Sequence, residues 1–293
     1  MKVKVKCPGS CGEYIQGIIG DSEKLISLPV DIYSEVTIEE KKNFHLDKKR
    51  KKAISALYKT LEYFDVPIEY VKSLSLTINS KIPIAKGMAS STADIYGTIM
   101  ATAKLIDKKL SEEEIAKLCS SIEPTDSIIF EKLTLFDHIK GVIKKRFEWN
   151  PKINILVLEG KGTLDTQEFR KRDFDHLRKK NKKYVEKAFE YFSRACREKD
   201  KKLLGMACTI SSLANQDIVF KPKLNEIIEI SYKFNAYGVN VAHSGTVIGI
   251  LYDENAADIE KLIYSLNKIN ISEEYSKIYS VKSVEGGVRY LVK

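Results

Sequence analysis

Residues 83–94 combine small side chains with two adjacent hydroxyls at the predicted start of a helix. Gly87 and Ala89 leave the backbone accessible, and Ser90 and Ser91 provide the hydroxyls. A helix N-terminus offers unpaired N–H groups and the positive end of the peptide dipole, so a phosphate group binds well there. The hydroxyls can cap the helix or reach a phosphate or a Mg²⁺ ion. From these residues alone, an ordinary helix cap is the simpler interpretation.

This segment resembles the phosphate loop of the GHMP small-molecule kinases, whose usual pattern is Pro, three residues and Gly-Leu-Gly-Ser-Ser-Ala-Ala. The matching positions are Pro83, Gly87, Ser90, Ser91 and Ala93, and the departures are Met88, Ala89 and Thr92. It is not a Walker A loop, because no Gly-Lys-Ser/Thr follows at that motif's spacing. The version found here is similar to one branch of the family, the L-threonine kinases of cobalamin synthesis.

The resemblance implies that the chain uses ATP and Mg²⁺. The nucleotide would be bound by Pro83, Lys86, Gly87, Met88, Ala89, Ser90 and Ser91. Ser91, or Ser90, would touch the metal, and backbone N–H groups of 87–91 would hold the phosphates.

A second acidic segment, Glu123-Pro124-Thr125-Asp126-Ser127, lies where many of these kinases carry a catalytic Asp. Phosphoryl transfer mainly requires alignment of a hydroxyl with the γ-phosphate, so Asp126 would orient or deprotonate the acceptor. Glu123 would complete the Mg²⁺ shell, because the ion prefers oxygen ligands. A helix stop followed by an Asp-Ser turn is the alternative interpretation.

The segment 7–17 occupies the place of the family's first motif, which usually begins Pro-Gly and then Arg or Lys. Ser10 replaces that base, so the cation that would assist the acceptor hydroxyl is open, with Lys24 and Lys86 as candidates. Ser10 and Glu13 are expected to face the substrate. A glycine-rich turn without ligand contact is the alternative.

Two further segments contribute candidate substrate contacts. In Phe136-Asp137-His138, again similar to the threonine-kinase branch, Asp137 would bind the substrate ammonium beside His138, although a structural Asp-His hydrogen bond is the simpler interpretation. The segment 242–247 stands in place of the glycine-rich third motif, and its small residues permit close backbone approach. His243 and Ser244 are expected near the substrate, where His243 meets the acceptor's carboxylate or only packs.

Composition narrows the class of protein. The 293 residues carry a net charge of +9, concentrated in the basic runs 48–52 and 178–183. Without interleaved aromatic residues these runs favour a solvated surface over nucleic-acid binding. No apolar run reaches about 18 residues, which predicts a cytoplasmic protein without a membrane partner. Five cysteines predict free thiols; Cys7 and Cys11 lack the further soft ligands that a zinc site needs.

Hydrophobic periodicity predicts the elements that position these groups. Strands are expected within the first forty residues, at 74–78, in the apolar segments 128–136, 142–143 and 153–158, and at 238–242, 246–252 and 287–292. Helices are expected at 49–63, from 92 onward, from a Ser111 capping box to about 122, and at 179–196, 201–214, 223–234 and 255–266. With the resemblance, this order predicts a two-lobed α+β fold, an N-terminal lobe at 1–160 with mixed sheet and helices and a C-terminal α/β lobe at 161–293.

The resemblance implies ATP-dependent phosphorylation of the side-chain hydroxyl of L-threonine, feeding cobalamin synthesis. Another GHMP kinase, such as one acting on homoserine, is the nearest alternative, because one methyl or methylene group discriminates by only about 1 to 3 kcal/mol. A catalytically silent nucleotide-binding protein is a second alternative, motivated by Ser10, and a basic nucleic-acid binder is a third. The oligomeric state is left open.

Overall fold

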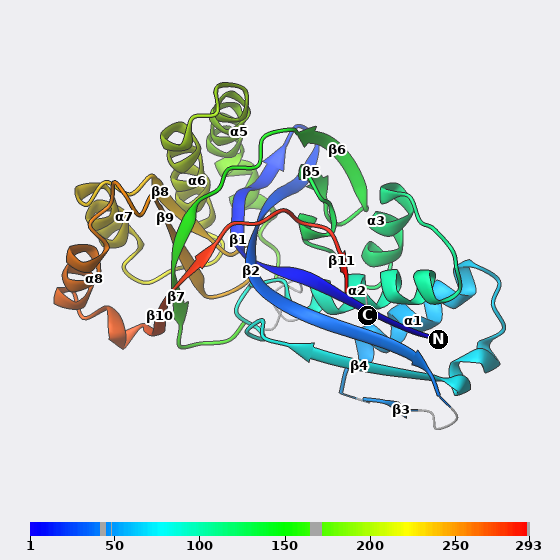
Figure 1. The fold of residues 1–293 in the computed structure, drawn as a ribbon. Coiled ribbons are helices and arrows are strands. Elements are labelled where there is room, and N and C mark those ends of the chain that lie inside the picture. The colour runs from blue at the N-terminus through cyan, green and yellow to red at the C-terminus, as the bar shows by residue number, and fades with distance from the viewer. Residues whose placement is uncertain (42–44, 48, 165–171, 292–293) are drawn as a thin grey trace.

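The computed structural model describes residues 1–41, 45–47, 49–164 and 172–291. One eleven-stranded sheet runs through them in the order β10-β7-β9-β8-β1-β2-β4-β3, with β5, β6 and β11 off this path (Figure 1). The strands are β1 (Lys2–Ile19), β2 (Ser22–Glu40), β3 (His45–Leu46), β4 (Leu74–Ser80), β5 (Leu133–Asp137), β6 (Val142–Phe147), β7 (Asn154–Gly160), β8 (Gly238–Val241), β9 (Val247–Tyr252), β10 (Tyr275–Lys282) and β11 (Arg289–Tyr290).

Strands β1 and β2 form a long antiparallel hairpin at the centre of this sheet. β2 continues the sheet through β4, and Glu13 of β1 pairs with Val241 of β8 to join the other half. The register between β1 and β2 shifts three times between Pro8 and Ile15. Such bulges re-aim side chains. The irregular part of the hairpin therefore coincides with the glycine-rich segment singled out in the sequence.

Helices gather at the two ends of the sheet (Figure 1). At one end lie α1 (Lys51–Tyr63), α2 (Ser90–Leu105) and α3 (Glu112–Ser120); at the other lie α5 (Asp175–Glu198), α6 (Lys201–Asn215), α7 (Leu224–Lys233) and α8 (Ile259–Lys268). The predicted capping box of α3 is confirmed, since Ser111 and Glu114 exchange both bonds. On α2 the predicted buried face is confirmed by Ala93, Tyr96 and Ile99. The α+β fold class is thus the one expected.

Three details differ from the sequence predictions. The segment expected as a strand from 128 begins as a 3-10 turn, Ser127–Ile129, before β5. The last strand is only Arg289–Tyr290, and residue 292 lies outside the described residues. Strand β10 was not predicted. Among the described strands it pairs with β7 alone, at the sheet edge, so most of its residues are partly or fully exposed and its apolar signal is weak. A boundary near residue 160 stays a prediction.

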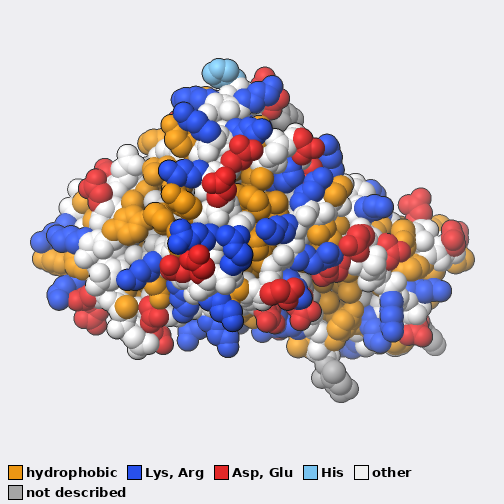
Figure 2. All heavy atoms as spheres, turned by 90° about the horizontal axis from the view of Figure 1, so that it is seen from above, with side chains coloured by type: hydrophobic (Ala, Val, Ile, Leu, Met, Phe, Trp, Pro, Cys, Tyr) orange, Lys and Arg blue, Asp and Glu red, His pale blue; other side chains and the backbone are white. Residues whose placement is uncertain are grey.

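The basic runs contribute partners to ion pairs. Arg50 contacts Asp94 at 2.6 Å, Lys180 contacts Asp217 at 3.2 Å, and Lys52 pairs with Glu123. The face drawn in Figure 2 shows Lys and Arg side chains interspersed with Asp and Glu. Among the described residues, no helix is long and apolar enough to span a membrane.

Helix α6 packs its backbone directly against the start of β8. A Cβ added at Gly205 would lie 2.0 Å from the Tyr237 carbonyl oxygen, whereas one at Gly97 of α2 would meet the Val36 side chain at 2.7 Å. Alanine normally favours a helix over glycine by about 1 kcal/mol. We expect Gly205→Ala to destabilise the protein instead, lowering the free energy of unfolding by roughly 2 to 3 kcal/mol. The reason is that the backbone at Tyr237 cannot move away from the added methyl group. Denaturant unfolding measures this.

Gly97→Ala is the matched comparison, since its obstacle is the Val36 side chain and not a backbone carbonyl. We expect the loss of unfolding free energy at Gly97 to be smaller than at Gly205. Equal losses at the two positions would contradict the close α6–β8 contact.

Candidate active site

The segments 7–17 and 242–247 meet at the loop that precedes α2. The Ser10 amide donates to the Met88 carbonyl at 3.0 Å, and the Thr246 amide donates to the Lys86 carbonyl at 2.9 Å. A Cβ on Gly87 would lie 2.8 Å from the Gly245 Cα. Segments far apart in the chain therefore hold the phosphate-loop candidate between them, at distances that only small residues allow.

The loop has the backbone shape of an anion site. Ala85, Gly87 and Ala89 all have positive φ, and Ala89 is the N-cap of α2. No described side chain caps this helix. The first-turn N–H groups therefore remain available to a ligand, and left-handed residues at every second position of 85–89 favour a concave run of amides. Ser90 and Ser91 open the helix and are half-buried, so an ordinary serine cap is not what the structure shows.

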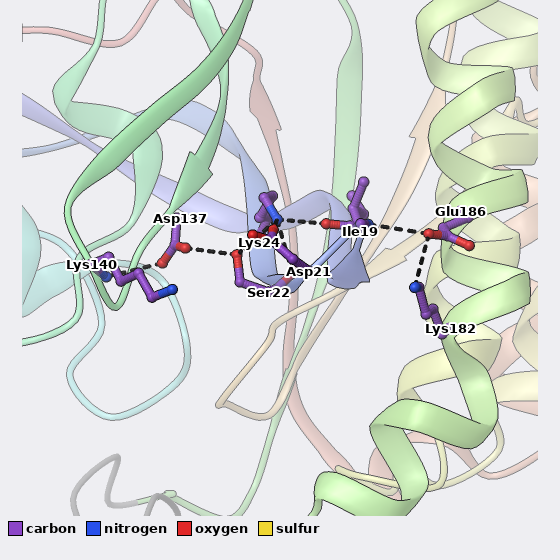
Figure 3. Close-up of polar contacts among 9 residues, drawn as sticks. Ile19, Asp21, Ser22, Lys24, Asp137, Lys140, Lys182 and Glu186 are labelled. Atoms are coloured by element: carbon purple, nitrogen blue, oxygen red, sulfur yellow. Dashed lines mark hydrogen bonds and ion pairs between the residues drawn. The ribbon is translucent and has the colours of Figure 1, made fainter.

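The two lysines considered as assisting cations have other partners. Lys86 donates to the carbonyls of Gly160 at 2.6 Å and Gly162 at 2.8 Å, which ties the end of β7 to the loop. Lys24 is buried and donates to the Ile19 carbonyl at 2.5 Å (Figure 3). Both ammonium groups therefore have protein partners in this structure, and a role of either lysine as the assisting cation stays a prediction. The part of Lys86 in nucleotide binding stays a prediction.

Asp126 is held against the first turn of α2. The Thr92 hydroxyl donates to Asp126 Oδ2 at 3.0 Å. The flanking loop is fixed to β2, because Ser27 and Ser127 each accept the other's backbone N–H, at 2.8 and 3.0 Å. The proposed base and the proposed phosphate site therefore belong to one rigid unit. Thr92, a departure from the usual family pattern, supplies the connection.

Glu13 is the buried partner of Asp126. It is 3% exposed and accepts the His243 backbone N–H at 3.1 Å. Burial raises the pKa of Glu13 well above its usual value, and the charge of Asp126 and a hydrogen bond with that carboxyl raise it further. Two adjacent carboxyls cannot both ionise at low cost. Glu13 therefore holds a proton more tightly than an isolated carboxyl does.

Lys221 is a residue that sequence reasoning missed. It lies between α6 and α7 and is 2% exposed. Burial lowers its pKa to about 7, while the charge of Glu13 acts in the opposite direction. Its sequence context, Phe220-Lys221-Pro222, gives no sign of burial. A cation of the C-terminal half thus reaches the electrostatic neighbourhood of Glu13.

The remaining predicted residues are placed as follows. Asp137 accepts from the Ser22 hydroxyl at 2.7 Å and from the Lys140 amide at 3.0 Å (Figure 3), and Glu123 pairs with Lys52. Both carboxylates therefore have protein partners, and their ligand roles stay predictions. Ser10 is fully buried, whereas Pro83 and Ser244 are half-buried.

His138 and His243 meet a carboxylate that the sequence did not single out. Glu23 Oε1 lies 3.0 Å from His243 Nε2, and Glu23 Oε2 lies 3.1 Å from Arg178 Nε. Burial raises the pKa of Glu23, but the hydrogen bond of His243 and the charges of His243, His138 and Arg178 together lower it to about 2. The His138 and His243 rings lie edge to face, 5.3 Å apart. No local pattern joins these four residues, because they come from distant segments.

Comparison with known proteins agrees with this arrangement. Residues 50–130 match the model of the GHMP kinases N terminal domain, and residues 192–268 match GHMP kinases C terminal. The chain is 37% identical over 284 residues to an L-threonine kinase of Salmonella typhimurium, covering 97% of this chain and 94% of that protein. It is 36% identical to an L-threonine kinase of Citrobacter freundii, covering 97% and 98% of the two chains.

Solved structures agree on the fold. A mevalonate kinase superposes with a TM-score of 0.68 at 20% identity, covering 96% of this chain and 99% of that one. A homoserine kinase from Cytophaga hutchinsonii superposes with a TM-score of 0.72 at 15% identity, covering 99% and 97%. At these identities the likeness concerns the fold. The two family models and the full-length relatives together show that this chain belongs to the GHMP kinases, as an ATP-dependent small-molecule kinase.

Proposed function

We propose that this kinase phosphorylates the side-chain hydroxyl of L-threonine, giving L-threonine O-3-phosphate for cobalamin synthesis. The observation that carries the proposal is the 36 to 37% identity to L-threonine kinases along 97% of the chain. The site supports it with a carboxylate, Asp126, fixed beside the N-terminus of α2.

Backbone amides and one carboxylate perform the main steps. The amides of 87–91 hold the phosphate groups of ATP at the positive end of α2. Asp126 accepts or orients the proton of the attacking hydroxyl, and the Thr92 hydroxyl keeps that carboxylate aligned. The raised pKa of Glu13 assigns the proton of the pair to that carboxyl, which leaves Asp126 as the one proposed to take the hydroxyl proton.

The oxygen donors near the loop suit Mg²⁺, which prefers hydroxyl, carboxylate and water ligands. Ser91 and Glu123 would hold the ion, which supplies charge neutralisation on the phosphates. Lys52 already pairs with Glu123. The Glu123 carboxylate must therefore bind Lys52 and the ion together, or release Lys52 when it binds the ion. Lys52 therefore sets how readily Glu123 reaches a metal.

Lys221 is the cation that best replaces the base missing at Ser10. It lies in the field of Glu13, and Glu13 is hydrogen-bonded to Asp126. A positive charge here stabilises the ionised form of the Asp126–Glu13 pair and offsets charge gathered during transfer. Lys221 acts through Glu13, so it is a positioning residue.

The acceptor is tested by incubating the pure protein with Mg-ATP and L-threonine, homoserine, serine or a sugar. We expect the largest kcat/KM for L-threonine, measured as ADP release, with a phosphomonoester on the threonine oxygen by phosphorus NMR. Faster turnover of homoserine would agree with a small-molecule kinase but contradict L-threonine as its acceptor. Calorimetric ATP binding without transfer to any alcohol would instead support a silent nucleotide-binding protein.

Asp126→Asn tests the base. We expect kcat to fall by at least about a hundredfold with ATP affinity nearly unchanged, because a positioned acid-base group contributes on that scale. Turnover close to the wild-type value would remove Asp126 from the reaction. Thr92→Val, which deletes the hydroxyl that donates to Asp126, should lower kcat by roughly tenfold.

Thr98→Val is the matched control for Thr92→Val. Thr98 lies on the same helix, and its hydroxyl donates to the Asp94 carbonyl instead. We expect kcat of this variant to stay within about twofold of the wild type. A similar fall in both variants would assign the Thr92 effect to the helix as a whole.

Lys221→Met tests the buried cation. The folded-state pKa of Lys221, about 7, is below its usual 10.5, so wild-type stability falls as pH drops from about 10.5 to about 7. We expect the variant's unfolding free energy to exceed that of the wild type by a few kcal/mol below pH 7, with the gap closing toward pH 10.5. We also expect kcat to fall at least about tenfold.

Lys179→Met, at an exposed position on α5, is the control and should show no such pH dependence. A destabilised Lys221→Met at pH 7 would make Lys221 a structural partner of Glu13. Wild-type turnover in that variant would remove its proposed role in catalysis.

A further inference from the structure

Three potential metal ligands converge beside the proposed base. Glu23 comes from β2, His138 follows β5 and His243 follows β8, and one ligand atom from each lies within 4.8 Å of the others. The side chains of Glu23 and His243 are 10% and 12% exposed, and His138 is 4% exposed. Buried groups of this kind need a compensating partner.

The hydrogen bonds of Gln16 define which nitrogen of His243 carries hydrogen. Gln16 Nε2 donates to the Val241 carbonyl at 3.0 Å, so its Oε1 faces His243 Nδ1 at 3.0 Å as an acceptor. Nδ1 therefore carries a hydrogen, so Nε2 is the ring nitrogen that can take a second proton or bind a metal ion. Nε2 faces Glu23 Oε1 at 3.0 Å.

Two acceptors at this distance require a cation between them, either a proton on Nε2 or a metal ion. The rest of the cluster has the features of a metal site. Arg178 holds the second oxygen of Glu23 at 3.1 Å, which leaves Oε1 as a single ligand atom. Outer partners of this kind, together with Gln16, typically orient metal ligands.

The ring geometry also fits. Two imidazoles bound to one tetrahedral ion at about 2.0 to 2.1 Å place their centres roughly 5 Å apart. The observed separation of His138 and His243 is 5.3 Å, with the rings at 73° to each other. Modest side-chain movement would bring three ligand atoms onto one ion.

We propose that Glu23, His138 and His243 form a binding site for a divalent transition metal of the zinc type. Two imidazoles and one carboxylate suit zinc, whereas Mg²⁺ prefers an all-oxygen shell, so this site differs from the one expected at the phosphates. Three protein ligands leave a fourth position open, as in sites that bind water or substrate.

The open position gives the site a place in the reaction. His243 donates its backbone N–H to Glu13, and Glu13 is hydrogen-bonded to Asp126. Resting on the proposed function, the ammonium group of an amino-acid acceptor gives its proton to solvent and binds at the fourth position as an amine, which brings the acceptor hydroxyl toward Asp126. Metal binding itself does not depend on that assignment.

The experiment uses full-length protein stripped of metal and titrated with Zn²⁺ against a chromophoric chelator. We expect one equivalent to bind with a submicromolar Kd. Glu23→Gln and His243→Ala should weaken binding at least a hundredfold, and Gln16→Leu should weaken it about tenfold. His176→Ala, which changes an exposed histidine of α5, should bind like the wild type.

Cobalt provides a second readout that identifies the ligands. Co²⁺ in this site should give visible bands of a four-coordinate nitrogen and oxygen shell without the near-ultraviolet thiolate band expected from Cys7 or Cys11. Glu23→Gln is nearly isosteric, so it serves if His243→Ala does not fold, and far-ultraviolet circular dichroism checks each variant.

Two results would overturn the proposal. One is a titration in which the protein does not bind one equivalent of Zn²⁺ with a Kd below about 10 μM. The cluster would then be an imidazolium–carboxylate pair without a metal. The other is equal affinity in the wild type, Glu23→Gln and His243→Ala. If the protein binds Zn²⁺ as expected but does not phosphorylate threonine, the metal site is supported and only the proposed acceptor is contradicted.

Discussion

The structure depends on the docking of two backbone segments, 7–17 and 242–247, on the loop that precedes α2. Carbonyl groups of Lys86 and Met88 accept amides from the third and first glycine-rich segments, and Gly87 lies against Gly245. Side chains larger than these would separate the segments by more than hydrogen-bond length. Because the contacts are between main chains, they fix the loop whatever ligand is bound. The amides at the start of α2 are therefore preorganised, which is how electrostatic stabilisation avoids a reorganisation cost during reaction.

Charge in the site is balanced across both halves of the sheet. Burial and the neighbouring Asp126 raise the pKa of Glu13, and Lys221 lies in the field of Glu13 from the segment between α6 and α7. Ser10 occupies the place of the usual base but is fully buried, where a long cationic side chain would have to displace its surroundings. Supplying the cation from another segment avoids that displacement. On the proposed function, Lys221 compensates for the serine at position 10, although the two residues are more than two hundred positions apart in the chain.

Local patterns predicted most elements but not the pairings between them. The capping box at Ser111, the long helix α2 and the loop before it follow from spacing and turn chemistry within a few residues. Asp126 was predicted by its position relative to that loop, whereas its bond to Thr92 was not. Periodicity reports which face of an element is buried, and it carries no information on which distant polar group it meets. For this reason Glu23 and Lys221 became visible only in the folded chain.

The position of Glu23 shows how distant contacts adjust the site. The turn from Ile19 to Lys24 lies between α5 and β5 (Figure 3). On one side the Gly20 amide donates to Glu186 of α5 at 3.1 Å, and on the other the Ser22 hydroxyl donates to Asp137 at 2.7 Å. Lys24 fills the turn from within by donating to three of its residues. A turn held from both sides and from inside cannot drift, so the Glu23 carboxylate within it stays at hydrogen-bond distance from His243. Residues remote from the phosphates thereby determine the geometry of the cluster beside Asp126.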